Sequence, residues 1–387
     1  MANERDRRRD FISSFIRQRE RIQRFATETS LICETQSINS KKVFEAASHP
    51  IVATSTPLSQ LTMPKASMLA LRLTAKPSSK AALALESLPI PTATADHNNV
   101  VIKVEAAAIN PSDILNANGG FEHTTLPRTL GRDYAGTVID GPADLTGQEV
   151  YGTSGNALGF TLDGTHAQYC IVPRTALASK PSNLSFAQAA TVGVPFTTAA
   201  LILRRAVLRS GEVVLVLGAS GAVGSAVSQL AERRGCRVLR AARRDNVDVN
   251  LAADPEMESA RVLTGGKGPD VVVDTVGDPD LTRRGLMSLA IGGRLVFISA
   301  PKKGSTDMTF DMKYVYRHEI SIVGCNSALA DIGDTAKDMD EMRKGFEDGS
   351  LQTAKEEDLH MIGMEEVVEV YEEQLRTGYR KNYVIRF

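Results

Sequence analysis

The segment from Glu212 to Gly235, EVVLVLGASGAVGSAVSQLAERRG, constrains the fold more than any other part of this chain. An apolar run ends at Gly218, and a helix-like pattern follows Gly221. Glycines at such a junction allow a tight turn and let backbone amides approach a diphosphate, whose charge lies at the helix N-terminus. The strict Gly-x-Gly-x-x-Gly form would need glycine where Ala219 stands. The segment predicts a dinucleotide-binding βαβ unit, against the alternative of a generic strand–turn–helix.

Two groups of residues are therefore predicted to bind the cofactor. Ligands of open parallel sheets bind outside the carboxyl ends of the strands, so residues after two further strands join the glycine loop. The alternative for each strand-end residue is a simple loop position. The predicted residues are Gly218, Ser220, Gly221, Ala222, Val223 and Gly224 in the loop, and Val276, Gly277, Phe297, Ile298 and Ser299 at the strand ends.

Arg243 and Arg244 follow the next strand, about twenty residues after the glycine loop. An NAD site usually has an acid there to bind the ribose 2′-hydroxyl, whereas an NADP site uses arginine to accept the 2′-phosphate. These residues predict NADPH as the cofactor. The alternative is an exposed charged loop, and Asp245 lies close enough to leave NAD open.

The sequence divides into parts with different patterns. Residues 68–190 contain short strand-like runs separated by turn residues, whereas residues 191–325 alternate continuous apolar strands with helices, which predicts a parallel sheet covered on both faces. Two polar helices follow, and the final strand NYVIRF is predicted to complete the first sheet. We predict a β-rich domain from residues 67–190 and 326–387, and a doubly wound Rossmann domain from residues 191–325.

The composition indicates a small-molecule partner. The formal net charge of −1 provides no long-range field for nucleic acid or an anionic membrane, and no apolar run approaches the ~18–20 residues that span a bilayer. The four cysteines form no Cys-x-x-Cys pair, so neither a disulfide framework nor a zinc lobe is indicated. We expect a cytoplasmic protein.

Residues 1–66 differ from the rest because they are rich in arginine and then polar and interrupted by proline. Three interpretations stay open: a disordered extension, a mitochondrial transit segment, or a natural chain that begins at Met63. The acidic residues Glu4, Asp6 and Asp10 argue against a transit peptide, since such peptides avoid acids.

Several motifs together resemble the zinc-independent quinone oxidoreductase branch of the medium-chain dehydrogenase/reductase superfamily. The resemblance covers residues 68–387 and implies a GroES-like domain formed by both chain ends with an inserted Rossmann domain. It also implies a homodimer through the edge of the Rossmann sheet. The motifs are AAINPSD (107–113), LGRDYAGTV (130–138), DGTHAQYCIVP (163–173), KPSNLSFAQAATVGVPFTTA (180–199), GASGAVGSAVSQLA (218–231), LTGGKGPDVVVDTVG (263–277) and GGRLVFIS (292–299).

The Arg132–Asp133 pair occupies the position of a Gly-His-Glu motif in the zinc alcohol dehydrogenases of that superfamily. Asn110 and Ser112 stand where the first metal ligand falls, and Asp133 without His or Cys beside it cannot complete a tetrahedral zinc site. The pair itself is expected to form an ion pair, either beside the site or purely structural. Without a Lewis acid, the expected acceptors are quinones and conjugated enones, which disperse the charge of an added hydride.

Some site residues are implied mainly by the resemblance, and each has a structural alternative. Asn110, Ser112 and Asp113 are predicted to contact nicotinamide or substrate, or else to cap the helix after Pro111. The remaining candidates are Thr198 near the cofactor or in helix packing, Tyr134 as a proton donor or core residue, and His123 as an acid or surface residue.

The predicted function is NADPH-dependent reduction of a quinone or other conjugated carbonyl without zinc. One alternative is a trans-acting enoyl-thioester reductase of polyketide or fatty-acid type; Phe121 counts against the mitochondrial type, in which a proton-donating Tyr is expected there. An alternative outside the enzymes is a structural or regulatory protein that binds the cofactor without turnover.

Overall fold

The computed structural model describes most of the chain after its first 65 residues. The predictions for residues 1–62 therefore lie outside the described residues, and only the last residue of the predicted extension 1–66 is described. The described residues belong to the compact unit Met63–Phe387. They are residues 66–75, 81–95, 98–301, 304–378 and 381–387.

The β-rich part contains two sheets, and the longest strand organises the larger one. β3 pairs antiparallel with β5 along one edge, and on its other edge with β7 over its first half and with β16 over its last residues. The smaller sheet has the order β2-β1-β4. The elements are β1 (Ser67–Leu73), β2 (Leu83–Pro89), β3 (Asn99–Ala108), α2 (Pro111–Ala117), β4 (Arg128–Thr129), β5 (Tyr134–Asp140), β6 (Glu149–Gly152), β7 (Tyr169–Pro173), η2 (Arg174–Ala176), β8 (Ala178–Ser179) and α3 (Phe186–Ala190).

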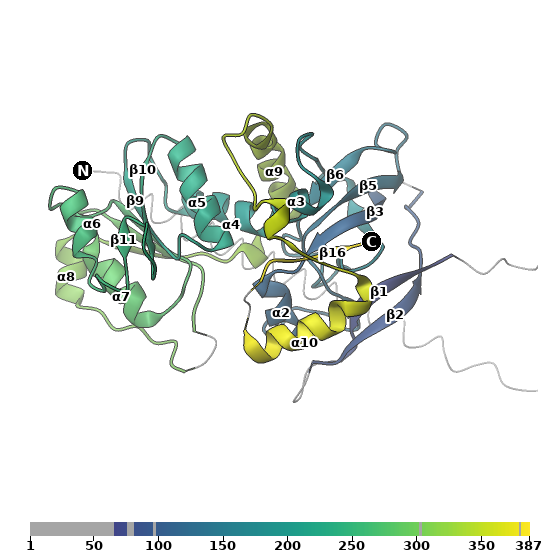
Figure 1. Ribbon diagram of the computed structural model, residues 1–387, viewed down its shortest axis with the longest axis horizontal. Coiled ribbons are helices and arrows are strands. Elements are labelled where there is room, and N and C mark those ends of the chain that lie inside the picture. The colour runs from purple at the N-terminus through teal and green to yellow at the C-terminus, as the bar shows by residue number, and fades with distance from the viewer. Residues whose placement is uncertain (1–65, 76–80, 96–97, 302–303, 379–380) are drawn as a thin grey trace, which may run out of the picture. The chain divides into compact units, whose positions relative to one another are not determined.

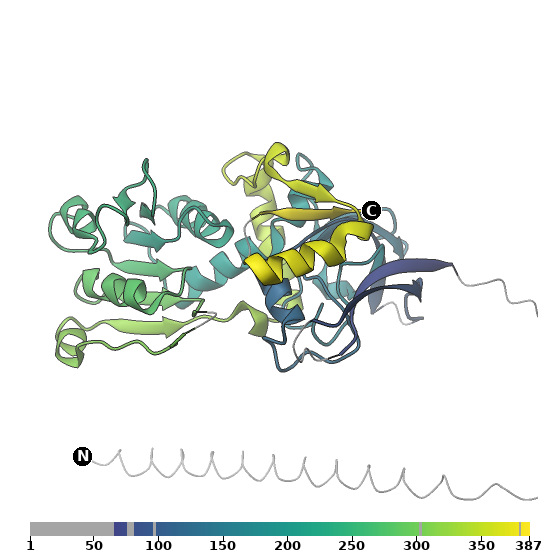
Figure 2. The ribbon, with the colours of Figure 1, turned by 60° about the horizontal axis from the view of Figure 1, so that its bottom comes forward.

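The C-terminal elements return to this part of the fold. β16 pairs with β3 in the register Val384↔Ala108, which confirms the prediction that the final strand completes the first sheet. In Figure 2 these yellow elements lie among the blue elements from the start of the domain. They are η3 (Ser327–Leu329), α9 (Ile332–Glu347), η4 (Glu356–Asp358), β15 (His360–Ile362), η5 (Met364–Glu366), α10 (Val367–Thr377) and β16 (Tyr383–Arg386).

The middle of the chain forms a parallel sheet of six strands in the order β11-β10-β9-β12-β13-β14, as the alternating pattern predicts. The sequence interpretation missed β2, the short strands β4, β8, β11 and β15, and the short helix α8. The elements are α4 (Gly193–Arg205), β9 (Val213–Leu217), α5 (Ala222–Arg233), β10 (Arg237–Ala242), β11 (Val249–Asn250), α6 (Glu258–Leu263), β12 (Val271–Asp274), α7 (Pro279–Ser288), β13 (Arg294–Phe297), α8 (Met312–Arg317) and β14 (Ser321–Gly324).

Both faces of the parallel sheet are covered because alternate residues of each strand point to opposite sides. Val214 and Val216 of β9 belong to one hydrophobic cluster with residues of α4 and α5, whereas Leu215 and Leu217 belong to another with residues of α6 and α7. Figure 1 shows α5 and α7 on opposite sides of the sheet. The first cluster also includes Tyr151 of β6, so one apolar core joins the two sheets through α4.

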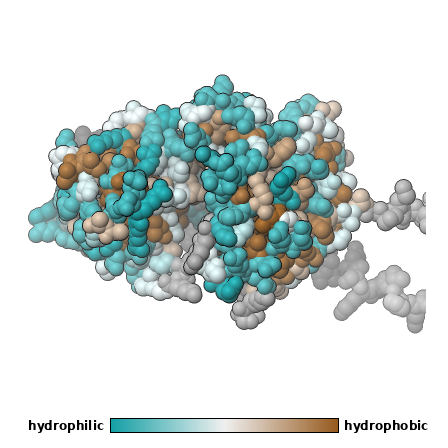
Figure 3. All heavy atoms as spheres, viewed as in Figure 1, coloured by the Kyte–Doolittle hydropathy of each residue, from teal (hydrophilic) through white to brown (hydrophobic). Residues whose placement is uncertain are grey.

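These observations confirm the predicted fold class, a β-rich domain completed by the C-terminal strand with an inserted parallel α/β domain. The boundaries at residues 190/191 and 325/326 stay predictions. Among the described residues, no helix has both the length and the apolar character that a membrane span requires. On the face shown in Figure 3, hydrophilic residues predominate and hydrophobic residues gather in separate areas.

Candidate active site

A cavity of about 870 Å³ lies at the carboxyl ends of β12, β13 and β14 and extends to residues of α2, α4 and the turn before β5. Its wall is mainly apolar, with one buried guanidinium and a few hydroxyl groups. The lining residues are Pro111, Ser112, Leu115, Phe121, Arg132, Val194, Thr198, Leu201, Arg205, Val223, Thr275, Phe297, Ile298, Ser299, Ala300 and residues 324–330. Six of the predicted site residues are therefore in the wall: Ser112, Thr198, Val223, Phe297, Ile298 and Ser299.

The turn before β5 depends on Gly131, which has a φ of +99° and lies so close to His166 that a Cβ atom would overlap its ring. His166 is fully buried, and its burial lowers its pKa to about 4, so the ring is neutral. Its Nε2 lies 3.1 Å from the carbonyl oxygen of Ala108, which can only accept, so Nε2 donates and Nδ1 accepts from Tyr371 at 2.9 Å. This arrangement fixes the turn that carries Arg132 to the cavity.

Arg132 is only 4% exposed and is held by neutral groups. Its Nε donates to Ser154 Oγ at 2.7 Å, and its Nη1 donates to Ser112 Oγ at 2.9 Å. The guanidinium carbon lies 5.4 Å from the centre of the Phe160 ring, a favourable cation–π distance. The guanidinium is thus clamped in one orientation at the cavity wall.

Asp133 is fully buried and bonds to the β-rich and Rossmann parts rather than to Arg132. Its Oδ2 accepts from Asn110 Nδ2 at 3.0 Å and from the N–H of Val194 at 2.8 Å, at the start of α4. Burial raises the pKa of this carboxyl group, while the hydroxyl of Thr153, the Val194 N–H and the Arg132 charge oppose the rise. The expected Arg132–Asp133 ion pair is not formed in the described structure, because each side chain bonds to other partners.

Asn110 and Asp113 cap helix α2, which was the structural alternative for them. Asp113 Oδ2 accepts from the Asn110 N–H at 2.8 Å, and both side chains are buried outside the cavity wall. Burial raises the pKa of Asp113 to about 7, against the lowering effect of the Arg132 charge. The two residues position Ser112, the member of this turn that reaches the cavity.

Tyr134 lies in the hydrophobic core of the β-rich part, only 1% exposed, with its ring against Gly152. Its hydroxyl group has no hydrogen-bond partner in the described structure, and burial raises its pKa well above the ordinary value. It is absent from the cavity wall, so the structure places it as a core residue, which was the alternative to a proton donor. His123 is exposed and packs against Phe121 and Phe160 beside the cavity.

The glycine loop has the geometry of a diphosphate cradle. Gly218 has a φ of +79°, and a Cβ there would meet Thr275 and Val276, so the loop lies against the end of β12. A Cβ at Gly224 would overlap the carbonyl oxygen of Gly218, whereas a Cβ at Gly221 would meet nothing closer than 3.4 Å. Gly221 thus stands at the open N-terminus of α5, whose first N–H groups have no intrahelical partners. The loop fits a dinucleotide.

Thr198 supplies a second sign of a ligand. It lies on α4 and lines the cavity, and its buried Oγ1 has no hydrogen-bond partner among the described residues. A buried hydroxyl without a partner costs about 1–3 kcal/mol, which a polar ligand atom would recover. Val276 is exposed, and Gly277, with a φ of +76°, is close to Ser299.

Arg243 and Arg244 are exposed at the carboxyl end of β10. The nearby Asp245 accepts from Asn250 Nδ2 at 2.9 Å, so its carboxylate is already engaged. The adenosine ribose of a bound dinucleotide is expected at this position. There the structure has two exposed arginines, Arg243 and Arg244, and one aspartate, Asp245, that is already hydrogen-bonded.

Several cavity residues were missed from the sequence. Leu115 lies on α2, Phe121 lies in the loop after that helix, and the segment 324–330 begins at the last residue of β14. The rule that ligands bind at the carboxyl ends of parallel strands could have identified the segment 324–330, because β14 is the last strand of the sheet. Leu115 on α2 and Phe121 in the loop after it carry no comparable signal, since single apolar residues near the surface are common.

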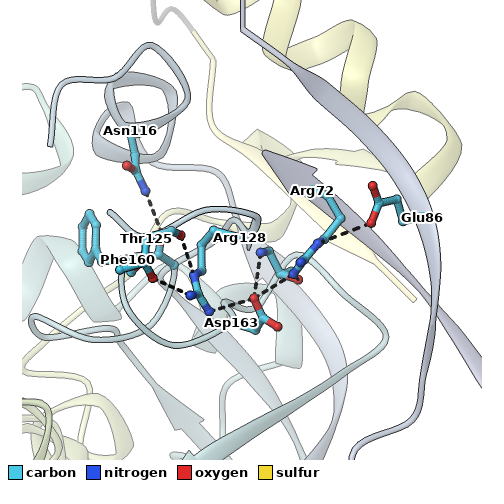
Figure 4. A network of polar contacts seen from close by, with 9 residues as sticks. Arg72, Glu86, Asn116, Thr125, Arg128, Phe160 and Asp163 are labelled. Atoms are coloured by element: carbon cyan, nitrogen blue, oxygen red, sulfur yellow. Dashed lines mark hydrogen bonds and ion pairs between the residues drawn. The ribbon is translucent and has the colours of Figure 1, made fainter. Parts of the chain in front are cut away.

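A polar network beside the cavity positions the loop that carries Phe160 (Figure 4). Asp163 Oδ1 accepts from Arg72 Nη1 at 2.8 Å and from Arg128 Nη1 at 3.0 Å. Arg128 Nε also donates to the carbonyl of Thr125, whose own N–H donates to the carbonyl of Phe160 at 3.0 Å. The network therefore connects Phe160, whose ring contacts the Arg132 guanidinium, to Arg72 on strand β1.

The residues at this site do not fit a zinc ion. Arg132 is a cation, and the Oδ2 atom of Asp133 is already engaged by two N–H donors. Structural and catalytic zinc sites take three or four thiolate, imidazole or carboxylate ligands. In residues 66–387, apart from the short stretches that are not described, no group of three such side chains could hold a metal.

Comparisons with known proteins agree with this fold and site. Residues 96–182 match the family model described as alcohol dehydrogenase GroES-like domain, and residues 222–344 match the model described as zinc-binding dehydrogenase. The zinc-type alcohol dehydrogenase-like protein C337.11 of Schizosaccharomyces pombe is 49% identical over 285 residues, which cover 74% of this chain and 87% of that protein.

Two further proteins are similar. A quinone oxidoreductase of Sus scrofa is 31% identical over 230 residues, which cover 55% of this chain and 67% of that protein. The crystal structure of an alcohol dehydrogenase superfamily protein from Novosphingobium aromaticivorans superposes with a TM-score of 0.70 at 25% identity, covering 83% of this chain and 99% of that one.

A GroES-like domain joined to a Rossmann domain, with a glycine cradle beside a mainly apolar cavity, defines an oxidoreductase class that uses nicotinamide cofactors. The chain belongs to the medium-chain dehydrogenase/reductase superfamily, in its quinone oxidoreductase-like branch.

Proposed function

We propose that this protein reduces quinones or other conjugated carbonyl compounds with NADPH and without zinc. The observation that carries the proposal is the composition of the cavity: apolar side chains surround one fixed guanidinium and a threonine hydroxyl that has no hydrogen-bond partner among the described residues. A plain alcohol or ketone needs strong stabilisation of an alkoxide, whereas a conjugated acceptor spreads the charge over several atoms. The apolar wall also suits an uncharged, ring-shaped acceptor.

When bound, the reduced nicotinamide would supply a hydride ion, that is, a proton with two electrons. Gly218, Gly221 and the first turn of α5 would hold the diphosphate, and Thr198 would face the polar end of the nicotinamide half. The apolar wall excludes water, and the fixed side chains position the acceptor, so the protein contributes mainly orientation. With Tyr134 buried in the core, solvent at the cavity mouth supplies the proton.

The test is a panel of acceptors with purified full-length protein. We expect NADPH oxidation with a benzoquinone and with a cyclic enone, and slower or no oxidation with an aliphatic ketone. Addition of a zinc chelator should leave the rate unchanged. Turnover with an enoyl thioester but with neither a quinone nor a simple enone would favour the enoyl-thioester reductase instead, and binding of NADPH without any turnover would favour a structural role.

The preference for NADPH is tested by Arg243→Ala. A charge-assisted hydrogen bond is worth about 1.5–3 kcal/mol, so the dissociation constant for NADPH should rise about 10-fold or more while that for NADH stays the same. Arg240→Ala is the matched control, because Arg240 lies on β10, three residues before Arg243, and pairs with Glu232. Cofactor fluorescence titration measures both constants. Equal losses for NADPH and NADH would contradict the 2′-phosphate assignment.

We also propose that the protein forms a homodimer through strand β14. β14 ends the parallel sheet and pairs only with β13 among the described strands, and Ile322 on it is 37% exposed. Leu329, just beyond, is 73% exposed. An unpaired edge with exposed apolar side chains is a template for pairing with another chain.

Ile322→Lys should convert this dimer to a monomer, since a lysine on an edge strand opposes pairing. Val262→Lys, an equally drastic change at an exposed position on α6, is the control. Light scattering coupled to size-exclusion chromatography gives the mass of each variant. A wild-type protein that elutes as a monomer, or a dimer that survives Ile322→Lys, would argue against this interface.

A further inference from the structure

Arg132 is a buried cation without a buried anion in contact with it. The hydrogen bonds of its guanidinium in the described structure go to two hydroxyl groups, Ser154 Oγ and Ser112 Oγ, and none goes to a carboxylate. Buried charges are normally paired or coordinated, because removing a charge from water is expensive. Because Arg132 lies in the cavity wall, a ligand atom with negative charge could contact it there.

The two nearby carboxyl groups do not fill this role. Asp133 directs its Oδ2 to Asn110 and Val194, and Asp113 directs its Oδ2 to the Asn110 N–H within the cap of α2. Both act on Arg132 only through space. The positive charge of Arg132 is thus partly balanced at a distance but has no contact partner of opposite charge.

The guanidinium is also preorganised. Two hydroxyls hold Nε and Nη1, and the Phe160 ring covers the group at 5.4 Å. A guanidinium has five N–H donors, so these two bonds leave the others for a ligand. Donors fixed before a reaction stabilise developing charge more effectively than donors that must reorient.

On the basis of the proposed function, we infer that Arg132 binds the carbonyl oxygen of the acceptor and stabilises the negative charge that develops there. As the hydride forms a new C–H bond at the β-carbon of an enone, the carbon–carbon π pair moves to form the enolate double bond, and the carbonyl π pair moves to oxygen. Arg132 donates hydrogen bonds to that enolate oxygen. The α-carbon then takes a proton from water, which leaves as hydroxide: the enolate π pair forms the new C–H bond and an oxygen pair re-forms the carbonyl, so one hydride and one proton are added in total.

This assignment narrows the substrate class. The acceptor carries a carbonyl oxygen at the Arg132 end and an apolar body toward Leu115, Phe121 and Leu201. A cyclic enone has this polarity, and so does an ortho-quinone, whose two carbonyl groups lie at one end of the ring. Arg132 keeps its proton throughout, because guanidinium groups do not titrate in the working range of an enzyme; it acts as an electrostatic donor and leaves proton transfer to water.

Arg132→Met tests the inference, with Arg132→Lys as the conservative variant. Loss of one donor to an oxyanion lowers kcat by about 100-fold or more, so Arg132→Met should lose that much with a cyclic enone. Arg132→Lys should recover part of the loss, and the dissociation constant for NADPH should change little. Arg204→Met, at an arginine that pairs with Asp338 outside the cavity, is the matched control. An undiminished kcat in Arg132→Met would overturn the inference.

A binding experiment tests Arg132 without turnover. 4-Nitrophenol imitates the enolate when it is ionised, and its two forms absorb at different wavelengths. The full-length protein with NADP⁺ should bind the ionised form preferentially and shift its titration to lower pH, whereas Arg132→Met should abolish the shift. A shift that survives in a folded Arg132→Met protein, with folding checked by circular dichroism, would contradict the inference. So would binding that does not distinguish the two forms.

The two experiments separate the inference from the proposed function. If no acceptor in the panel is reduced but the nitrophenolate shift depends on Arg132, the proposed function fails and the anion-binding role of Arg132 stands. If acceptors are reduced and the shift is independent of Arg132, the proposed function stands and this inference fails. Should Arg132→Met not fold, Ser154→Ala, which frees one side of the guanidinium, should reduce both the shift and kcat.

Discussion

Gly224→Ala should both destabilise the protein and abolish tight NADPH binding. A Cβ at this position would overlap the carbonyl oxygen of Gly218, which belongs to the backbone and cannot move aside as a side chain can. Overpacking of this kind costs about 1–3 kcal/mol of folding free energy, and the loop would have to deform where it holds the diphosphate. Chemical unfolding and cofactor titration of the same preparation would show both losses.

Gly221→Ala is the matched variant that separates binding from folding. Gly221 has a φ of −80°, which alanine adopts without strain, and its added Cβ would meet nothing closer than 3.4 Å. The free energy of unfolding should therefore change by less than about 1 kcal/mol. The NADPH affinity should nevertheless fall, because the methyl group enters the space where the backbone approaches the diphosphate. Unchanged affinity in Gly221→Ala would place the diphosphate elsewhere.

Asp113→Asn should make the stability of the protein less sensitive to pH. Burial raises the pKa of Asp113 from 3.8 to about 7 in the folded protein. Between these values the folded state keeps a proton that the unfolded state has lost, so the wild type loses stability as the pH rises from about 4 to about 7. A change of this size corresponds to about 4 kcal/mol. An asparagine carries no charge and can still accept from the Asn110 N–H.

Unfolding by denaturant at pH 4 and at pH 8 measures this effect. Asp113→Asn should be close to the wild type in stability at pH 4 and more stable than the wild type at pH 8. At pH 8 the folded wild type must bury an ionised carboxylate, whereas asparagine is neutral. Because the two proteins share every other titrating group, the difference between their free energies of unfolding at each pH reports on Asp113 alone. The same difference at both values would show that Asp113 titrates normally and would contradict the buried environment described above.

The fold was largely predictable because its strongest signals are local. The apolar run before Gly218 and the helix after Gly221 determine a βαβ unit, and alternation extends it to a parallel sheet. The return of the last strand was also predictable, since an alternating strand such as Tyr383–Arg386 needs a sheet to join. The two-residue β11 was missed because so short a strand has no periodicity, and β2 because its residues Leu83–Pro89 are only partly buried.

The site was predicted less completely, for a physical reason. Residue types indicate what a side chain can do, but the neighbours of a buried polar group come from distant parts of the chain. Arg132 and Asp133 are adjacent in sequence and suggest an ion pair, yet Asp133 bonds to Val194, 61 residues away, and Arg132 to Ser154, 22 residues away. Tyr134 illustrates the converse, since a hydroxyl that could donate a proton is enclosed in the core.

Transfer of deuterium from labelled NADPH to a cyclic enone tests the central claim most directly. With NADPH deuterated at either C4 position, mass spectrometry and NMR of the product locate the label. We predict that one of the two labelled cofactors, and only one, places deuterium on the β-carbon of the saturated ketone, and that this transfer proceeds in the presence of a zinc chelator. Recovery of an allylic alcohol with deuterium on the carbonyl carbon, or transfer that stops when zinc is removed, would contradict the account.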